Sequence, residues 1–98
     1  MMEKQHPMLG RNCIARTYSA GVHYGKVVAV NGSEVHLQNA LRIWRWTGGG
    51  LSLSAIANKG MKGGRVDDTK EVYLTQVVEL IPTTKEAEES YGRFIERY

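Results

Sequence analysis

Hydrophobic and polar side chains alternate over short stretches in the first half of the chain, which is the pattern of half-buried β-strands. Alternation and β-branched residues predict four strands, at 13–18, 22–30, 34–39 and 41–46. Residues 19–21 predict the first turn. Asn31 and Gly32 predict a hairpin turn between the second and third strands, because both tolerate a positive φ. Only a bend at Asn39 and Ala40 separates the last two strands.

The pattern changes to helical spacing after three consecutive glycines. Ser52 as N-cap and Gly60 as a left-handed stop predict a short helix between them. Residues 61–69 contain few apolar side chains and two adjacent glycines, so we expect a mobile loop. The basic part of this segment, 59–65, would either close over a ligand as a lid or reach a site on a neighbouring subunit. Residues 70–81 return to a strand pattern, which Pro82 ends.

The C-terminal segment predicts an amphipathic helix. Thr83 and Glu86 have the spacing of a capping box. Apolar residues then recur at helical intervals, at Ala87, Tyr91, Phe94, Ile95 and Tyr98. The elements together predict an α+β fold, a small curved antiparallel sheet or SH3-like half-barrel of about five strands, with a short helix and this amphipathic helix packed against it.

Length and composition limit the class of protein. The 98 residues predict a flexible N-terminal arm at 1–11 and a single domain at 12–98, small enough that self-association would help its stability, so we expect a homo-oligomer. Cys13 is the single cysteine, and no set of residues has metal-ligand spacing, so we expect no metal and no cofactor. Without a long apolar stretch, we expect no membrane contact and a cytoplasmic location.

Charge is distributed unevenly along the chain. Residues 10–66 hold eight Lys or Arg and one acid, Glu34, whereas residues 67–98 hold four basic and eight acidic residues. The first part therefore favours an anionic partner.

The segment 39–52 contains both tryptophans and two arginines directly before Gly48, Gly49 and Gly50. Arginine forks match phosphate oxygens, indole faces stack on bases, and glycines allow a ligand to approach the backbone closely. The candidate ligand-binding residues are Arg16, Tyr18, His23, Arg42, Trp44, Arg45, Trp46, Gly48, Gly49, Gly50, Lys62 and Arg65.

Strand alternation makes a specific prediction for this segment. It places Arg42, Trp44 and Trp46 on one face of the strand, and the other face then holds Leu41, Ile43 and Arg45. Periodicity leaves open whether the tryptophans belong to the core, to an interface or to a binding site.

Catalytic signatures are absent from the sequence. The serines lack the Gly-x-Ser-x-Gly context, and the glycine run lacks the Lys-Ser/Thr end of a nucleotide-hydrolysing loop. His23 lies near a predicted turn, where it would contact a phosphate or donate a proton. We therefore expect binding without turnover and not an enzyme.

Three segments resemble a family of small phage and prophage proteins of unassigned domain: Arg-Thr-Tyr-Ser-Ala-Gly-Val-His at 16–23, Asn-Ala-Leu-Arg-Ile-Trp-Arg-Trp at 39–46, and residues 70–84. The resemblance implies a phage origin and an accessory role in the cytoplasm of an infected bacterium. By general type, the small size and basic glycine-rich segments also resemble phage sponge proteins, which sequester nucleotide signals of bacterial immunity.

Three functions follow as hypotheses. The first is an oligomeric binder that sequesters a small anionic, cyclic nucleotide without turnover and so counters bacterial defence. The second is a module that binds single-stranded nucleic acid by stacking and charge. The third is a protein-interaction or virion-assembly module, in which the aromatic residues form the contact surface.

Overall fold

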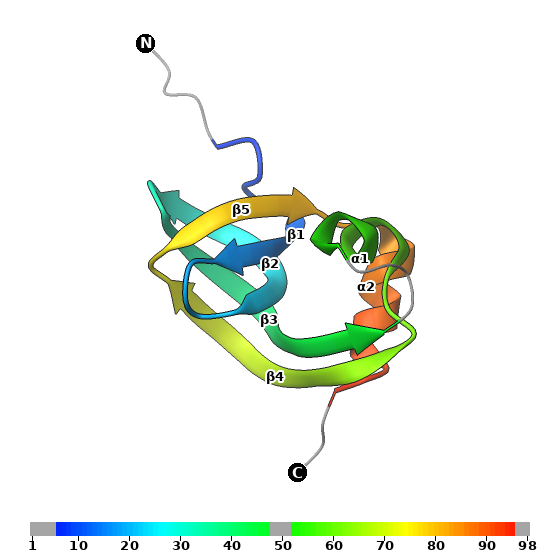
Figure 1. The fold of residues 1–98 in the computed structure, drawn as a ribbon. Coiled ribbons are helices and arrows are strands. Elements are labelled where there is room, and N and C mark those ends of the chain that lie inside the picture. The colour runs from blue at the N-terminus through cyan, green and yellow to red at the C-terminus, as the bar shows by residue number, and fades with distance from the viewer. Residues whose placement is uncertain (1–5, 48–51, 96–98) are drawn as a thin grey trace.

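The computed structural model describes residues 6–47 and 52–95 and contains one antiparallel sheet and two helices (Figure 1). The strands are β1 (Asn12–Thr17), β2 (Val22–Asn31), β3 (Glu34–Thr47), β4 (Gly63–Leu74) and β5 (Val77–Pro82), and the helices are α1 (Leu53–Lys59) and α2 (Lys85–Gly92). The order in the sheet is β4-β3-β2-β1-β5. The predicted α+β fold is therefore confirmed.

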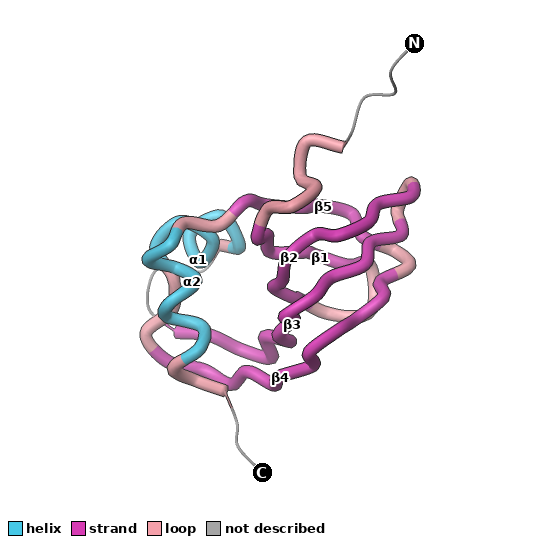
Figure 2. Tube along the Cα trace, turned by 180° about the vertical axis from the view of Figure 1, so that it is seen from behind, coloured by secondary structure: helices cyan, strands magenta, loops and turns pink. Residues whose placement is uncertain are grey.

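Each face of the curved sheet carries its own hydrophobic core, and the two cores lie at different ends of the sheet. Both helices lie together at one end of it, as Figures 1 and 2 show. The helix-side core contains Ile14, Leu41, Ile43, Ile56, Ala57, Met61, Val66, Ala87 and Tyr91. The hairpin-side core contains Cys13, Ala15, Val27, Val35, Leu37, Ala40 and Leu74. Adjacent residues of β1 thus enter different cores, because successive side chains point to opposite faces.

A bend in β3 and β4 connects the two ends of the sheet. Asn39 has φ 52° and Lys70 has φ 61°, and the register between the strands shifts on both sides of Ala40. Asparagine adopts this left-handed conformation more readily than most residues. Gly25 of β2 permits the close approach, since a Cβ there would lie 3.0 Å from Cβ of Leu37. The predicted strands 34–39 and 41–46 are one bent strand.

The predicted loop at 61–69 is wrong for most of its length, because β4 begins at Gly63. Gly63 pairs with Thr47, and Gly64 pairs with Trp46. A Cβ on Gly64 would lie 2.2 Å from the carbonyl oxygen of Arg45. This glycine therefore allows two strands to approach closely, and the lid that we expected from the glycines is excluded for residues 63–69.

Element boundaries at two turns also differ from the prediction. The single strand expected at 70–81 is divided at residues 75 and 76, where β4 ends and β5 follows. In the β2–β3 turn, Asn31 pairs with Glu34, so the two loop residues are Gly32, with φ 61°, and Ser33. A glycine with positive φ in the first loop position is typical of a type II′ turn.

The N-cap of α2 is Thr84, whose side chain accepts from the backbone N–H of Ala87, and not Thr83 as predicted. Thr83 instead donates through Oγ1 to the carbonyl of Asn12. A threonine thus caps the helix, which begins one residue later than predicted.

The predicted N-terminal arm is packed in part. Met8 and Leu9 lie against the hairpin-side core, and the N–H of Gly10 donates to the carbonyl of Val27. The first five residues of the predicted arm lie outside the described residues.

The helices cover the helix-side core and are joined to each other and to the sheet. The predicted Ser52 cap of α1 is confirmed, since its side chain accepts from the N–H of Ala55. Tyr91 is fully buried, and its hydroxyl donates to the carbonyl of Ile56 at 2.5 Å. Glu88 accepts from the Tyr24 hydroxyl at 3.0 Å and thereby links α2 to β2. No helix within the described residues is long and apolar enough to cross a membrane.

Replacing Gly60 with alanine should strongly destabilise the contact between the helices. Gly60 has φ 83°, and a Cβ there would lie 2.3 Å from Oγ of Ser90 and 3.0 Å from Cα of Ala87. We expect Gly60→Ala to lower the free energy of unfolding by about 3 kcal/mol, from left-handed strain and overpacking together.

The matched control is Gly21→Ala, because Gly21 has nearly the same φ of 84° and nothing within 4 Å of its Cβ position. This control should cost about 1 kcal/mol, the cost of left-handed backbone alone. Urea unfolding of both variants measures the difference, and equal losses would show that the contact with Ser90 is not tight.

Candidate ligand-binding face

A β-bulge at the end of β3 divides the predicted site. Ile43 pairs with Val66 and Arg45 pairs with Arg65, so Trp44 is an extra residue that has no partner of its own in β4. After the bulge, the side chains of β3 point to the opposite faces of the sheet from those that simple alternation predicts. Trp46 therefore packs against the helix-side core together with Leu41 and Ile43, while Trp44 is 53% exposed. The prediction that both tryptophans share a face with Arg42 is wrong for this reason.

The surface on the other side of the sheet is rich in arginine. We call it the arginine–tryptophan face and define it by Arg42, Trp44, Arg45 and Arg65. The Cζ atoms of Arg42 and Arg65 lie 5.2 Å and 6.0 Å from the centre of the Trp44 ring system. Both distances are within the range of cation–π attraction. The contacts hold two guanidinium groups beside a half-exposed indole.

Asp67 fixes the Trp44 indole by a hydrogen bond. The Trp44 Nε1–H group donates to Oδ2 of Asp67 at 2.5 Å, and Asp67 is the β4 partner of Arg42. The face and Asp67 together have three positive charges and one negative charge. Arg45 and Arg65 are exposed cross-strand partners, and like charges in that position destabilise a sheet. A bound anion would relieve this repulsion.

His23 lies beneath this face and has no exposed surface. Its Nε2 atom accepts a hydrogen bond from Nε of Arg42 at 3.1 Å. Burial and, to a smaller extent, the charge of Arg42 lower the pKa of His23 from 6.5 to about 4. The imidazole is therefore neutral at pH 7, and its burial prevents the predicted direct contact with a phosphate.

Two other predicted residues meet in a different place. Arg16 and Trp46 line a cleft of about 590 Å³ between the first turn and the start of α1. The other lining residues are Thr17, Gly21, Val22, Ser52, Leu53, Ser54 and Glu79. Arg16 and Glu79 are cross-strand partners, so the cleft presents a cation and a carboxylate side by side. Because Trp46 and Trp44 lie on opposite faces of β3, this cleft is separate from the arginine–tryptophan face.

The remaining predicted residues join neither place through a described contact. Tyr18 is 81% exposed at the first turn. Lys62 is exposed, and its backbone N–H donates to the carbonyl of Thr47. Gly48, Gly49 and Gly50 lie outside the described residues. The expectation that a ligand approaches their backbone closely is therefore still a prediction.

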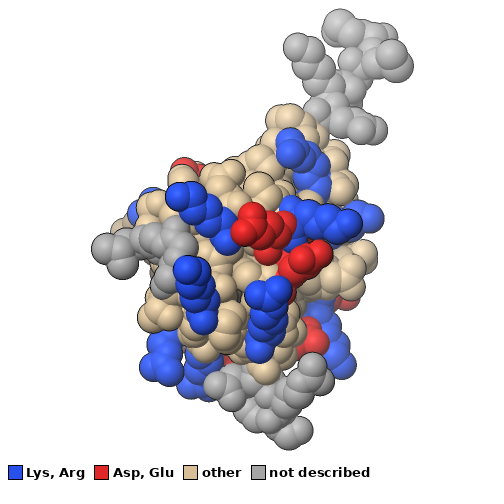
Figure 3. All heavy atoms as spheres, turned by 90° about the vertical axis from the view of Figure 1, so that its right-hand side faces the viewer, with Lys and Arg blue, Asp and Glu red and all other residues tan. Residues whose placement is uncertain are grey.

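Acidic and basic side chains are mixed on the side of the molecule that carries the helices, where acidic groups lie between basic ones (Figure 3). The acidic part of the sequence therefore does not form a separate surface on that side.

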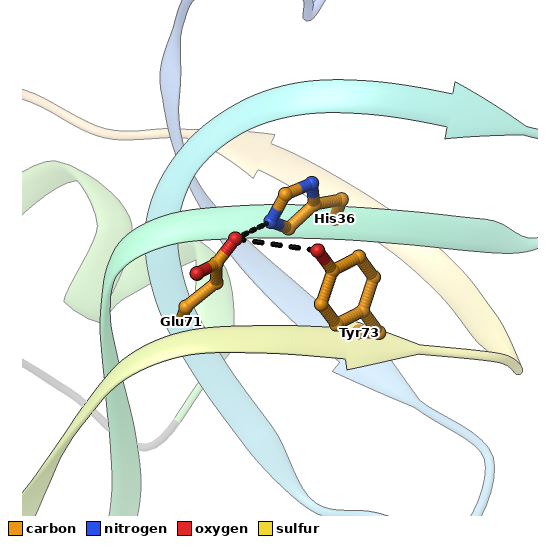
Figure 4. Close-up of polar contacts among 3 residues, drawn as sticks. All are labelled: His36, Glu71 and Tyr73. Carbon is orange, nitrogen blue, oxygen red and sulfur yellow. Dashed lines mark hydrogen bonds and ion pairs between the residues drawn. The ribbon is translucent and has the colours of Figure 1, made fainter.

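Sequence reasoning missed a polar cluster at the far end of β3 and β4, formed by His36, Glu71 and Tyr73 (Figure 4). His36 Nε2 contacts Oε1 of Glu71, and the Tyr73 hydroxyl donates to the same oxygen at 3.3 Å. The His36 and Tyr73 rings stack with centres 4.0 Å apart. Restricted hydration and Glu71 raise the pKa of Tyr73.

This cluster joins two strands across the sheet. His36 and Tyr73 also line a mostly apolar hollow of about 290 Å³. The described contacts show a shared acceptor, since His36 and Tyr73 both contact Oε1 of Glu71. Only the strand register, which pairs His36 with Tyr73, would have identified it from sequence.

His23 should make folding stability depend on pH. The unfolded imidazole binds a proton near pH 6.5 and the folded one only near pH 4, so between these values the unfolded state binds more protons. Stability must therefore fall as the pH falls. We expect wild type to lose about 3 kcal/mol more than His23→Gln between pH 7 and pH 4. Urea unfolding at both pH values measures this, and equal losses for the two proteins would contradict the assignment of a neutral buried imidazole.

Comparison with known proteins identifies the family but assigns no activity. No curated protein and no solved structure matches the chain. A family model described as a domain of unknown function, DUF6948, matches residues 10–91. The match includes all five strands and nearly all of α2, and therefore the arginine–tryptophan face, His23 and the cleft. The chain thus belongs to the DUF6948 family, whose function is unassigned.

Proposed function

We propose that the protein binds a phosphate-bearing nucleotide on the arginine–tryptophan face and holds it without chemical change. One observation carries the proposal: Trp44 is 53% exposed, with the guanidinium groups of Arg42 and Arg65 5.2 Å and 6.0 Å from its ring centre. Guanidinium groups form paired hydrogen bonds with phosphate oxygens, and indole and guanidinium planes both stack on bases. The face thus offers a partner for each part of a nucleotide.

The charges on this face favour an anion over a neutral aromatic ligand. Arg45 and Arg65 lie opposite each other, and a phosphate between them would replace repulsion by two attractions. Asp67 accepts the indole N–H and so fixes the ring, and its single negative charge lies beside three guanidinium groups, so the net charge of the group stays positive.

Binding without turnover agrees with the chemistry of the face. Arginine remains protonated at physiological pH and is a poor general base. Two other titratable groups adjoin the face: His23 is buried beneath Arg42 and has a pKa lowered to about 4, and the Asp67 carboxylate is already engaged by the Trp44 indole N–H. The residues on this face are therefore suited to holding a phosphate rather than to transferring its protons.

A small cyclic nucleotide is the ligand that we favour. The resemblance to phage proteins supports a biological role for such binding, since sequestering a nucleotide signal would counter bacterial immunity. Single-stranded nucleic acid presents the same phosphates and bases and is the competing ligand. Its affinity should fall steeply with salt, because each neutralised phosphate releases counterions.

Titration calorimetry with cyclic dinucleotides, cyclic trinucleotides, cyclic ADP-ribose isomers and a short oligothymidylate tests the proposal. We expect at least one of these probes to bind wild type. Arg42→Gln, Arg65→Gln and Trp44→Ala should each weaken that binding by about tenfold or more, through lost phosphate contacts or stacking. Oligothymidylate binding alone, weakened strongly by added salt, would identify a nucleic-acid strand as the ligand.

Two control variants locate the site. Arg93→Gln removes an exposed arginine just after α2 and should leave the affinity unchanged. Arg16→Gln removes the cation of the cleft. If Arg16→Gln abolishes binding while Arg42→Gln and Arg65→Gln do not weaken it, the cleft is the site and the proposed face is wrong. Absence of binding to every probe would overturn the proposal itself.

A further inference from the structure

A row of three cross-strand partners, one of which is Arg42, runs across the sheet at the arginine–tryptophan face. His23 of β2 is the strand partner of Arg42 of β3, and Arg42 is the partner of Asp67 of β4. His23 is fully buried, and Arg42 is only partly exposed. Arg42 donates through Nε to Nε2 of His23 at 3.1 Å, and its Cζ atom lies 5.2 Å from the centre of the Trp44 ring. The arginine is thus held from below by the imidazole and from the side by the indole.

We propose that His23 is a positioning residue, which fixes the Arg42 guanidinium in the orientation that receives a phosphate. This inference rests on the proposed function for its consequence in binding. The position of Arg42 in the free protein follows from the described contacts alone.

The hydrogen bond determines the state of the imidazole. A guanidinium group can only donate, so Nε2 of His23 must be unprotonated and the ring proton must lie on Nδ1. If both ring nitrogens of His23 were protonated, its Nε2–H group would face the Nε–H group of Arg42. The imidazolium would also lie beside the fixed positive charge of that arginine. The lowered pKa of about 4 agrees with this requirement and keeps Nε2 an acceptor at neutral pH.

Packing alone does not account for a histidine at this position. Nδ1 of His23 is buried and has no hydrogen-bond partner in the part of the chain that the structure describes. A buried polar group without a partner costs stability, which an apolar side chain of similar size would avoid. The favourable contribution of His23 therefore comes from Nε2 and its bond to Arg42.

The bond also determines which donors remain for a ligand. With Nε engaged, the two terminal amino groups of Arg42 are the groups left for phosphate oxygens or for Asp67. A guanidinium group held in place loses less conformational freedom when a phosphate binds than a free arginine side chain does. Loss of His23 should accordingly weaken binding although His23 has no surface that a ligand could touch.

Nuclear magnetic resonance of the free, ¹⁵N-labelled protein tests the positioning directly. We expect one arginine Nε–H signal to be protected from exchange with water, and Arg42→Lys assigns it by removing it. His23→Leu should abolish the protection. His23→Gln should keep it, because the glutamine side-chain oxygen offers an acceptor near the position of Nε2. Unchanged protection in His23→Leu would overturn the proposal, whether or not any nucleotide binds.

A double-mutant cycle with cyclic di-AMP and oligothymidylate as probes tests the consequence for binding. His23→Leu and Arg42→Lys should each weaken binding about tenfold, and the double variant should be no weaker than either one, because both changes remove the same positioned group. His23→Gln should bind within about threefold of wild type. An additive loss of about a hundredfold in the double variant would mean that His23 does not act through Arg42.

If His23→Leu fails to fold, His23→Asn replaces it, since its amide is too short to reach the same nitrogen of Arg42. Protection and affinity in His23→Asn equal to those in His23→Gln would then overturn the proposal. If wild type binds neither probe while the Nε–H signal behaves as expected, the proposed function fails for these probes but the positioning of Arg42 by His23 stands.

Discussion

The extra residue in β3 between Ile43 and Arg45 is the constraint on which the rest of the site depends. Without it, strand alternation would place Trp44 and Trp46 on the same side of the sheet. With it, Trp46 joins the helix-side core while Trp44 remains half-exposed between two arginines. One short sequence thus supplies a core residue and a surface residue of the same type. Bulges commonly redirect side chains in this way near functional sites.

The hydrophobic core is divided between the two faces of the sheet, and His23 is buried on the face opposite the helices. The helices cover one face of the sheet at one end, and the hairpin-side core occupies the other face at the opposite end. His23 and Arg42 lie on the face that the helices leave uncovered. There Arg42 lies above the imidazole and supplies its hydrogen-bond donor. The same guanidinium therefore satisfies a buried acceptor and contributes charge to the surface.

Local rules predicted much of the fold. Period-two alternation identified the strand positions of β1, β2 and β3, and the Ser52 cap identified α1, because these features depend on neighbours in sequence. The failures involved contacts between distant segments. Adjacent glycines such as Gly63 and Gly64 predict a flexible loop, but Gly64 provides the close approach of β4 to Arg45 and Trp46, which only the strand pairing reveals. For the same reason, sequence reasoning selected Arg42, Trp44, Arg45 and Arg65 by residue type but could not foresee the bulge that separates them from Trp46 and Arg16.

Iodide quenching of tryptophan fluorescence tests the role of the bulge most directly. The chain has two tryptophans, so Trp46→Phe reports on Trp44 alone and Trp44→Phe reports on Trp46 alone. Iodide should quench Trp44 several times more strongly than Trp46, because Trp44 is exposed beside positive charges that attract the anion, whereas Trp46 packs against the helix-side core. Equal quenching of the two tryptophans, or stronger quenching of Trp46, would contradict the division of the two residues between surface and core.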